Sequence, residues 1–178
     1  MEHVYIEGEK IYLRSITMDD SAQVIRWRNS DFVRQYFLIQ KEFTMESQKK
    51  WMREVVEPGK TVLFIFGILG ENRDIGSVNL KDIDHENRKA EYGIFIGEED
   101  CLGKGYGTEA AKLVTEYGFE KLHLHKIYLQ VIAENERARK SYQHAGFIKE
   151  AVLKDEVFQN GSFHDVIRMI KISENQDE

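Results

Sequence analysis

Hydrophobic and polar residues follow two different periods along this chain, and the two periods predict strands and helices in a mixed order. Alternation with a period of two predicts strands at 10–16, 60–69, 74–83, 89–96, 125–133, 148–159 and 162–172. Apolar residues at helical spacing predict helices at 21–29, 48–56, 109–122 and 135–147.

Local signals mark several ends of these elements. Thr17 followed by Asp20, and Thr44 in the sequence "TMES", are typical of residues that cap the start of a helix. Residues 70–72 predict a hairpin turn between two strands. Asn160-Gly161 is typical of a two-residue type I′ turn, so residues 148–172 are expected to form a second hairpin.

The resulting order, β-α-α-β-β-β-α-β-α-β-β, predicts an α+β fold with a mixed and mostly antiparallel sheet. One βαβ crossover is expected where a strand, a glycine-rich loop and a long helix follow one another. We expect a single domain over residues 1–172 and a frayed tail over residues 173–178.

Composition narrows the class of protein. The chain of 178 residues has a net charge of −6, so general nucleic-acid binding is not expected. It has no apolar run long enough for a membrane span and no signal-peptide profile, so we expect a cytoplasmic protein without membrane contact. Cys101 is the single cysteine, which excludes an internal disulfide, and no metal site is expected.

The glycine-rich loop at 103–108, "GKGYGT", carries the clearest chemical signal. Glycines let the backbone approach a ligand closely, and the helix behind them offers free N–H groups to an anion. The spacing fits neither a nucleotide P-loop, because Gly105 follows Lys104, nor a dinucleotide fingerprint, because Thr108 stands at the third glycine position. A plain strand-to-helix turn remains the alternative, although one glycine would suffice for it.

Two motifs together resemble the GNAT superfamily of acyl-CoA-dependent N-acyltransferases. "LGKGYGTEA" is similar to the family's pyrophosphate loop, except that Leu102 replaces a polar residue. "NERARKSY" places Asn135, Ala138 and Tyr142 at the spacing of the second family motif, and Gly146-Phe147 follows. The resemblance spans nearly the whole chain and implies helices on both faces of the sheet around a central coenzyme-binding βαβ unit.

The resemblance also implies how acetyl-CoA is held as a cosubstrate. Its pantetheine arm would pair with the strand at 89–96, its pyrophosphate would meet the amides of the glycine loop, and the two basic residues at 139 and 140 would either reach phosphates or form a solvated helix face. The expected coenzyme-binding residues are Ile94, Phe95, Ile96, Leu102, Gly103, Lys104, Gly105, Tyr106, Gly107, Thr108, Asn135, Arg139 and Lys140.

The reaction needs a base for the attacking amine and an acid for the leaving thiolate. By resemblance, Glu91 is the expected base, acting through water, and Tyr142 is the expected acid. The alternatives are a surface glutamate at a strand end, with water alone sufficing as base, and a core tyrosine beneath the coenzyme.

The amine acceptor is less well defined by the sequence. The chain resembles a branch that contains ribosomal-protein N-terminal, polyamine and amino-sugar acetyltransferases, and its C-terminal half is especially similar to spermidine acetyltransferases. Residues 26–53 nevertheless hold seven basic and three acidic residues. With Arg28 and Arg34 as substrate-binding residues, this excess favours an anionic acceptor such as an amino-sugar nucleotide, or a protein N-terminus.

Three alternatives therefore stay open at this point. A polyamine such as spermidine is the alternative acceptor, and a non-catalytic acyl-CoA-binding module is the alternative of another class. The basic segment can also be a solvated helix face. Homo-oligomerisation is likewise left open by the sequence.

Overall fold

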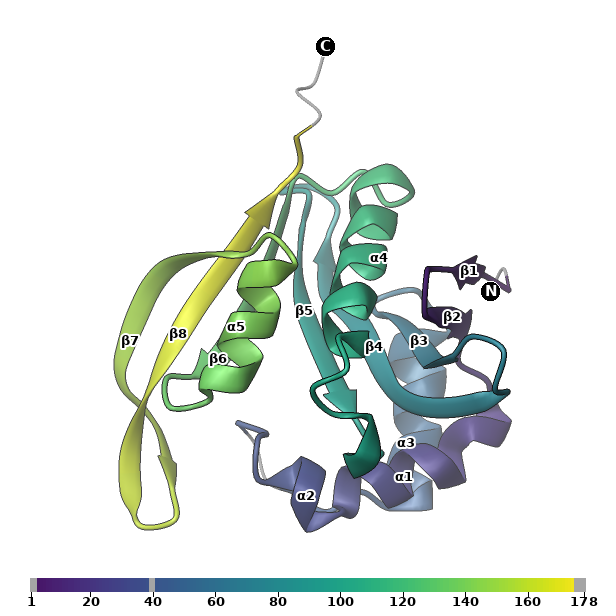
Figure 1. The fold of residues 1–178 in the computed structure, drawn as a ribbon, viewed down its shortest axis with the longest axis horizontal. Helices are drawn as coiled ribbons and strands as arrows, with labels where there is room; N and C mark the ends of the chain where they lie inside the picture. The colour runs from purple at the N-terminus through teal and green to yellow at the C-terminus, as the bar shows by residue number, and fades with distance from the viewer. Residues whose placement is uncertain (1–2, 39–40, 175–178) are drawn as a thin grey trace.

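A single eight-stranded sheet organises the computed structural model, which describes residues 3–38 and 41–174 (Figure 1). The sheet order is β1-β2-β3-β4-β5-β6-β8-β7, and among the described ladders only β5 and β6 run parallel. The strands are β1 (Tyr5–Glu7), β2 (Ile11–Ser15), β3 (Val62–Ile68), β4 (Arg73–Asp84), β5 (Lys89–Ile96), β6 (Lys126–Ile132), β7 (Ile148–Gln159) and β8 (Ser162–Ile172).

Helices cover both faces of this sheet, as the sequence predicts. The α-helices of the described residues are α1 (Ser21–Asn29), α2 (Asp31–Arg34), α3 (Met45–Trp51), α4 (Tyr106–Glu120) and α5 (Glu136–His144). Short 3₁₀ turns, η1 (Met18–Asp20) and η3 (Glu99–Cys101), precede α1 and α4, and the π-helical segment η2 (Met52–Val56) extends α3. The α+β prediction with one βαβ crossover, β5-α4-β6, is confirmed.

Three elements differ from the sequence prediction, and each is short or irregular. β1 has three residues and α2 has four, so neither repeats a hydrophobic period often enough to be recognised. The helix expected at 48–56 changes to π-helical hydrogen bonding at Met52. In the tail expected to fray, the amide of Ser173 still donates to the carbonyl of His125 at 2.9 Å, while residues 175–178 lie outside the described part of the chain.

The predicted turns and caps are present. Thr44 accepts a hydrogen bond from the amide of Ser47 and caps α3. Asn160 and Gly161 have φ values of 51° and 82°, and they join the paired residues Gln159 and Ser162. Positive φ at both turn positions is the type I′ geometry that fits the twist of a hairpin.

Alternate residues of the central strands pack into two separate hydrophobic cores, one on each face of the sheet. Phe64 and Phe66 of β3 point toward α4, whereas Leu63 and Ile65 point toward α1 and α3. On the α4 side, Gly118 lets the helix approach the sheet, since a Cβ there would crowd side chains of β4 and β6. Both faces are therefore fixed by close packing, which holds the strands between them in place.

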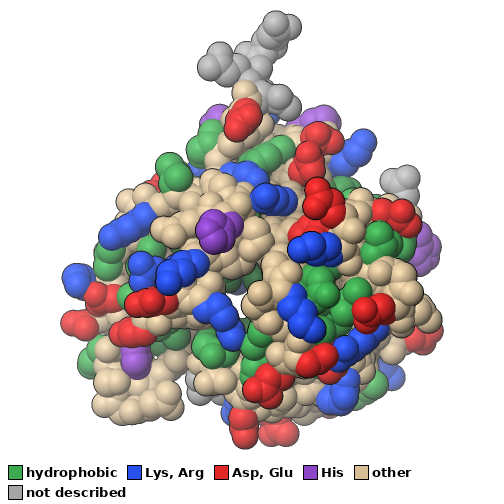
Figure 2. Space-filling view, viewed as in Figure 1, with side chains coloured by type: hydrophobic (Ala, Val, Ile, Leu, Met, Phe, Trp, Pro, Cys, Tyr) green, Lys and Arg blue, Asp and Glu red, His purple; other side chains and the backbone are tan. Residues whose placement is uncertain are grey.

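The sheet opens into a cleft between the parallel strands β5 and β6. The β5–β6 ladder comprises three register pairs, from Lys89–Lys126 to Glu91–Tyr128. Beyond them, β5 stays paired with β4 as far as Ile96, and β6 stays paired with β8 as far as Ile132. The two half-sheets therefore diverge (Figure 1), and the surface is hollowed between α5 and the glycine loop (Figure 2).

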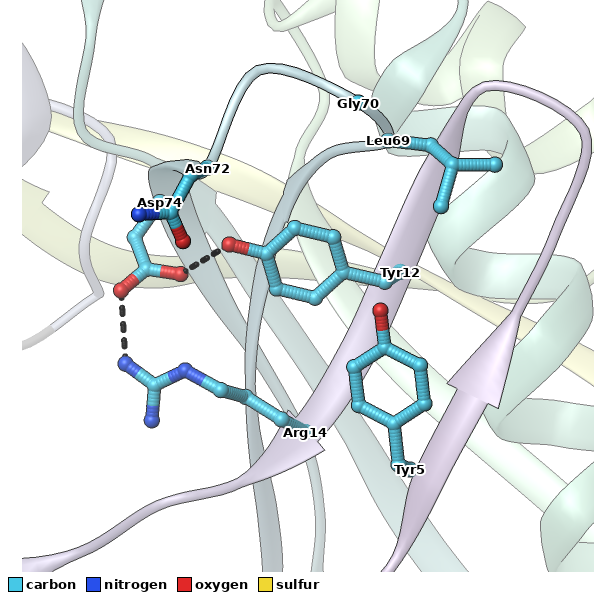
Figure 3. A pocket seen from close by; sticks show the side chains of 7 residues that line it. All are labelled: Tyr5, Tyr12, Arg14, Leu69, Gly70, Asn72 and Asp74. Atoms are coloured by element: carbon cyan, nitrogen blue, oxygen red, sulfur yellow. Dashed lines mark hydrogen bonds and ion pairs between the residues drawn. The ribbon is translucent and has the colours of Figure 1, made fainter.

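A second hollow, of about 510 Å³, lies at the far edge of the sheet (Figure 3). It is lined by Tyr5, Tyr12, Arg14, Leu69, Gly70, Asn72 and Asp74. Arg14 pairs with Asp20 and Asp74 at 2.6 Å, and the Tyr12 hydroxyl donates to Asp74 at 2.7 Å. These polar groups already satisfy one another, so we assign them to stability at this edge rather than to ligand binding.

The Asp20 carboxylate makes this network sensitive to acid. Burial alone would raise the pKa of Asp20, but hydrogen bonds from Arg14 and Thr17 outweigh it and hold the pKa below its usual value. A lowered pKa in the folded state stabilises the protein above the unfolded pKa of about 4. That contribution is lost as the pH falls from about 4 through the lower folded value.

We therefore expect Asp20→Asn to lower the free energy of unfolding at pH 7 by about 1–2 kcal/mol, because charged hydrogen bonds are lost. The variant should also lose less stability than the wild type between pH 4 and pH 2. Urea unfolding across this pH range measures both effects. Asp19→Asn, at the exposed neighbouring position, is the control. An unchanged acid slope in Asp20→Asn would contradict the assignment.

Candidate active site

The glycine loop ends in a helix start that is open to a ligand. Gly103 and Gly105 have φ values of 71° and 86°, and Gly105 is the N-cap of α4. The first bond of the helix runs from the amide of Glu109 to the carbonyl of Gly105, so the amides of residues 106–108 have no partner within the helix. A Cβ at Gly103 or Gly105 would meet no described atom within 4 Å. The predicted loop thus has the geometry of an anion cradle.

Side-chain contacts fix the start of α4 in place. The Glu109 carboxylate accepts hydrogen bonds from the amides of Glu9 and Lys10 at 2.6 and 2.9 Å, which ties α4 to the β1–β2 turn. The hydroxyls of Thr108 and Ser141 lie 2.9 Å apart and join α4 to α5. The cradle is consequently preorganised, because a ligand need not order the first turn of the helix.

The predicted residues of β5 line the cleft on both faces of the strand. Ile94 and Ile96 point toward α4, with their Cδ1 atoms 3.9 and 3.6 Å from the place of a Cβ on Gly107. Phe95 points to the opposite face, where its ring centroid lies 6.2 Å from Trp27 and 6.0 Å from Phe37. All three residues lie beyond the last β5–β6 register pair.

The predicted residues of α5 have different local partners. The Asn135 side chain caps the helix by accepting from the amide of Ala138 at 3.2 Å. Arg139 donates to the carbonyl of Ala133 at 2.7 Å, so it closes the β6–α5 connection. Lys140 is exposed and lies 4.0 Å from Glu136, one helical turn before it.

Tyr142 lies on the face of β5 that α4 and α5 cover. Its ring meets Tyr92 and Phe147 edge-on, at centroid distances of 5.8 and 6.2 Å. Burial raises the pKa of the Tyr142 hydroxyl to about 12. The hydroxyl is therefore protonated at neutral pH, and burial makes it a weaker acid than a free tyrosine.

Glu91 belongs to the last β5–β6 register pair and lies at the apex of the cleft. Its side chain is 15% exposed, and its carboxylate lies 3.0 Å from the ammonium of Lys81. Successive residues of a strand point to opposite faces, so Glu91 and Tyr92 are on opposite sides of the sheet. The candidate base and the candidate acid thus approach the apex from different faces.

Arg28 is held between two aromatic rings. Its guanidinium carbon lies 3.7 Å from the centroid of Phe43 and 5.2 Å from that of Phe37. Burial lowers the pKa of Arg28 to about 10, and its Nε has no hydrogen-bond partner among the described residues. The structure places Arg34 at the end of α2.

The remaining basic residues of 26–53 do not converge on the cleft. Arg26 pairs with Glu98 at 3.0 Å. Lys41, Lys49, Lys50 and Arg53 are exposed. Charges of both signs are also interspersed on the face drawn in Figure 2. Most of the positive excess that the sequence displays therefore lies at the surface, where Lys50 and Arg53 line a hollow together with Glu46 and Glu54.

Sequence reasoning missed two polar groups near the apex. Asn79 pairs in register with Gly93, where the missing Cβ leaves room for the amide, and its Oδ1 is buried without a partner among the described residues. The hydroxyl of Tyr92 is also buried, and it has no hydrogen-bond partner among the described residues. No spacing in the sequence signals either atom, since both depend on pairing between strands.

A third missed residue joins two segments that lie far apart in the sequence. Gln159, at the β7–β8 turn, donates to the carbonyls of Phe37 and Leu38 at 2.7 and 3.1 Å. This contact joins the segment after α2 to the C-terminal hairpin. The Asn160-Gly161 turn signal locates the hairpin but gives no hint of this contact.

Comparisons with known proteins agree with this geometry. The family model described as acetyltransferase (GNAT) domain matches residues 10–148. The chain is 47% identical over 94 residues to the spermidine N(1)-acetyltransferase of Escherichia coli K12, an alignment that covers 53% of this chain and 50% of that protein. The chain thus matches about half the length of such curated relatives. None of the described helices has the length and apolar character of a membrane span.

Two further relatives cover most of the chain. The crystal structure of spermidine N-acetyltransferase from Vibrio cholerae in complex with CoA and spermine superposes with a TM-score of 0.85 and 28% identity, covering 93% of this chain and 96% of that one. The probable N-acetyltransferase YjcK of Bacillus subtilis is 33% identical over 170 residues, or 90% of this chain and 92% of that protein. Because the family model and YjcK both align with most of its length, the chain belongs to the GNAT family of acetyltransferases.

Proposed function

We propose that this protein transfers the acetyl group of acetyl-CoA to a primary amine of a polyamine such as spermidine. The observation that carries the proposal is the likeness of the fold, over 93% of the chain, to an acetyltransferase bound to CoA and spermine. The cleft between β5 and β6 supplies the matching site in this chain.

The described residues fit a coenzyme with a pyrophosphate and a pantetheine arm. The open glycine cradle offers the amides of residues 106–108 to two phosphates. The β5 backbone from Tyr92 to Ile96 has no β6 partner in the ladder, so its polar groups can pair with the amides of the arm. Asn135 uses its oxygen for the cap and keeps its NH₂ as a donor toward the arm.

The acceptor amine must be neutral before it attacks the thioester that acetyl-CoA supplies. A free alkylamine has a pKa near ~10, so it arrives as an ammonium ion. Glu91 takes this proton through water on one face of β5, and the Asn79 oxygen accepts a second N–H. On the other face, Tyr142 donates its proton to the departing thiolate. The second proton, which the acetylated nitrogen must lose to become an amide, passes through solvent and restores the Tyr142 hydroxyl. Glu91 and Tyr142 thus act on opposite faces of the strand.

An anionic amine is the second candidate acceptor, and Arg28 favours it. A buried guanidinium without a described carboxylate partner can pair with a phosphate or a carboxylate. Against this candidate, Arg26 is paired and Lys41, Lys49, Lys50 and Arg53 are exposed, which leaves Arg28 and the half-buried Arg34. A non-catalytic acyl-CoA-binding module is disfavoured, because a protein that only binds the coenzyme needs neither a base such as Glu91 nor an acid such as Tyr142.

Gly105→Ala tests the cradle, because a methyl group would stand where phosphates approach. We expect CoA affinity to fall at least tenfold, about 1.4 kcal/mol, by calorimetry. Gly70→Ala is the matched control, since Gly70 has a similar φ of 84°, equally open space and a position at the β3–β4 turn. Both variants carry the same backbone strain, so equal CoA affinities would refute the cradle.

Tyr142→Phe tests the acid. We expect kcat to fall by about 10²-fold while CoA affinity stays unchanged, because the ring and its packing are kept. Tyr92→Phe removes a neighbouring buried hydroxyl and should retain turnover. If Tyr142→Phe turned over at the wild-type rate, the residue would be a packing residue only.

The acceptor is tested by CoA release with spermidine, spermine, an N-terminal peptide and an amino-sugar nucleotide. We expect spermidine to give the highest kcat/KM, by at least tenfold. If the amino-sugar nucleotide gave the highest value and Arg28→Met removed that activity, the anionic candidate would replace the polyamine. CoA binding without turnover of any amine would favour the non-catalytic module.

A further inference from the structure

The stem that leads into the glycine cradle is acidic, which is unexpected beside an anion site. Glu98, Glu99 and Asp100 lie just before the loop and are separated from Gly103 by Cys101 and Leu102. Like charges near a pyrophosphate weaken its binding unless cations offset them. Arg73 from β4 makes two hydrogen bonds to Asp100, at 2.7 and 2.8 Å, and Arg26 from α1 pairs with Glu98 at 3.0 Å. Two of the three carboxylates are thus held and compensated by other elements.

Trp27 of α1 makes a second connection to the same stem. Its indole Nε1 donates to the Glu98 carboxylate at 2.7 Å. The ring is 2% exposed and lies against Gly97, where any Cβ would overlap the indole. The ring also meets Phe95 edge-on at 6.2 Å. One side chain of α1 therefore contacts β5 and the stem of the cradle together.

We propose that Glu98 is a positioning residue that fixes the glycine cradle against α1. The inference rests on the proposed function, since it assumes that the cradle holds the coenzyme pyrophosphate. Without the carboxylate, the Trp27 N–H is left buried and unpaired, and the stem loses its hydrogen bond to Trp27 and its ion pair with Arg26. The coenzyme must then order the loop itself, and this cost appears as weaker binding.

Glu98 does not reach the phosphates in this arrangement. Its effect on coenzyme binding is therefore indirect and acts through the position of the loop.

The test compares acetyl-CoA with acetylpantetheine, a donor that has the thioester and the arm but lacks the pyrophosphate. We expect Glu98→Ala to lower kcat/KM for acetyl-CoA at least tenfold, mainly by raising KM. The same variant should change kcat/KM for acetylpantetheine less than twofold. Glu98→Gln keeps an oxygen for the Trp27 N–H and should recover most of the loss. Glu99→Ala, at the exposed neighbouring position of the stem, is the control and should behave as the wild type.

Equal losses for both donors, or a Glu98→Ala variant that matches Glu99→Ala, would overturn the positioning role. Calorimetric titration with CoA supplies a readout independent of turnover, and a thermal melt identifies a variant that has lost its fold. If Glu98→Ala does not fold, Trp27→Phe takes its place in the test, because it removes the N–H and keeps a ring. We then expect the same loss with acetyl-CoA and the same small change with acetylpantetheine. Equal use of both donors by the wild type would instead refute the pyrophosphate cradle, and the inference would fall with it.

Discussion

The site depends on the early end of one hydrogen-bond ladder, where β5 and β6 separate after three register pairs. The backbone N–H and C=O groups on the facing edges of the two strands are left without a strand partner there. Each strand is stable because it is hydrogen-bonded to another strand along its other edge. β4 and β8 provide that pairing throughout, so the chain can keep an open backbone edge inside the molecule. A ligand with amide groups can replace the missing strand.

The elements around this opening divide its chemistry between two faces. Tyr142 and the cradle lie on the face covered by α4 and α5, while Glu91, Asn79 and Arg28 lie toward α1 and α2. Alternation along β5 makes the division unavoidable, because neighbouring residues point to opposite sides. Trp27 and Glu98 connect the faces, since the indole touches both β5 and the stem of the cradle.

The sequence predicted the features that depend on local pattern. The strands, the capping residue Thr44, the type I′ turn and the glycine cradle each have a signature within a few residues, and each is present. The family resemblance followed from two such motifs, and the α+β fold followed from the order of the predicted strands and helices. The positions of the coenzyme and acceptor residues are compatible with their expected roles, which remain predictions.

What the sequence did not reveal depends on contacts between distant segments. The seven basic residues of 26–53 favoured an anionic acceptor, but charge along the sequence does not say where side chains point. In the structure Arg26 is paired, and Lys41, Lys49, Lys50 and Arg53 are exposed. The unpartnered oxygen of Asn79 arises from its register with Gly93. The bond between Trp27 and Glu98 joins residues 71 positions apart, for which no spacing rule exists.

The contact of Gln159 with the carbonyls of Phe37 and Leu38 has a consequence for the order in which the protein forms. It joins residues more than 120 positions apart, so closing that loop carries an entropic cost that can be repaid only late. During synthesis the N-terminal helices leave the ribosome long before the hairpin exists. The segment after α2 therefore acquires its final position only once the C-terminal hairpin has formed. Phe37, which packs against Phe95 of β5, is thus among the last side chains to be fixed in place.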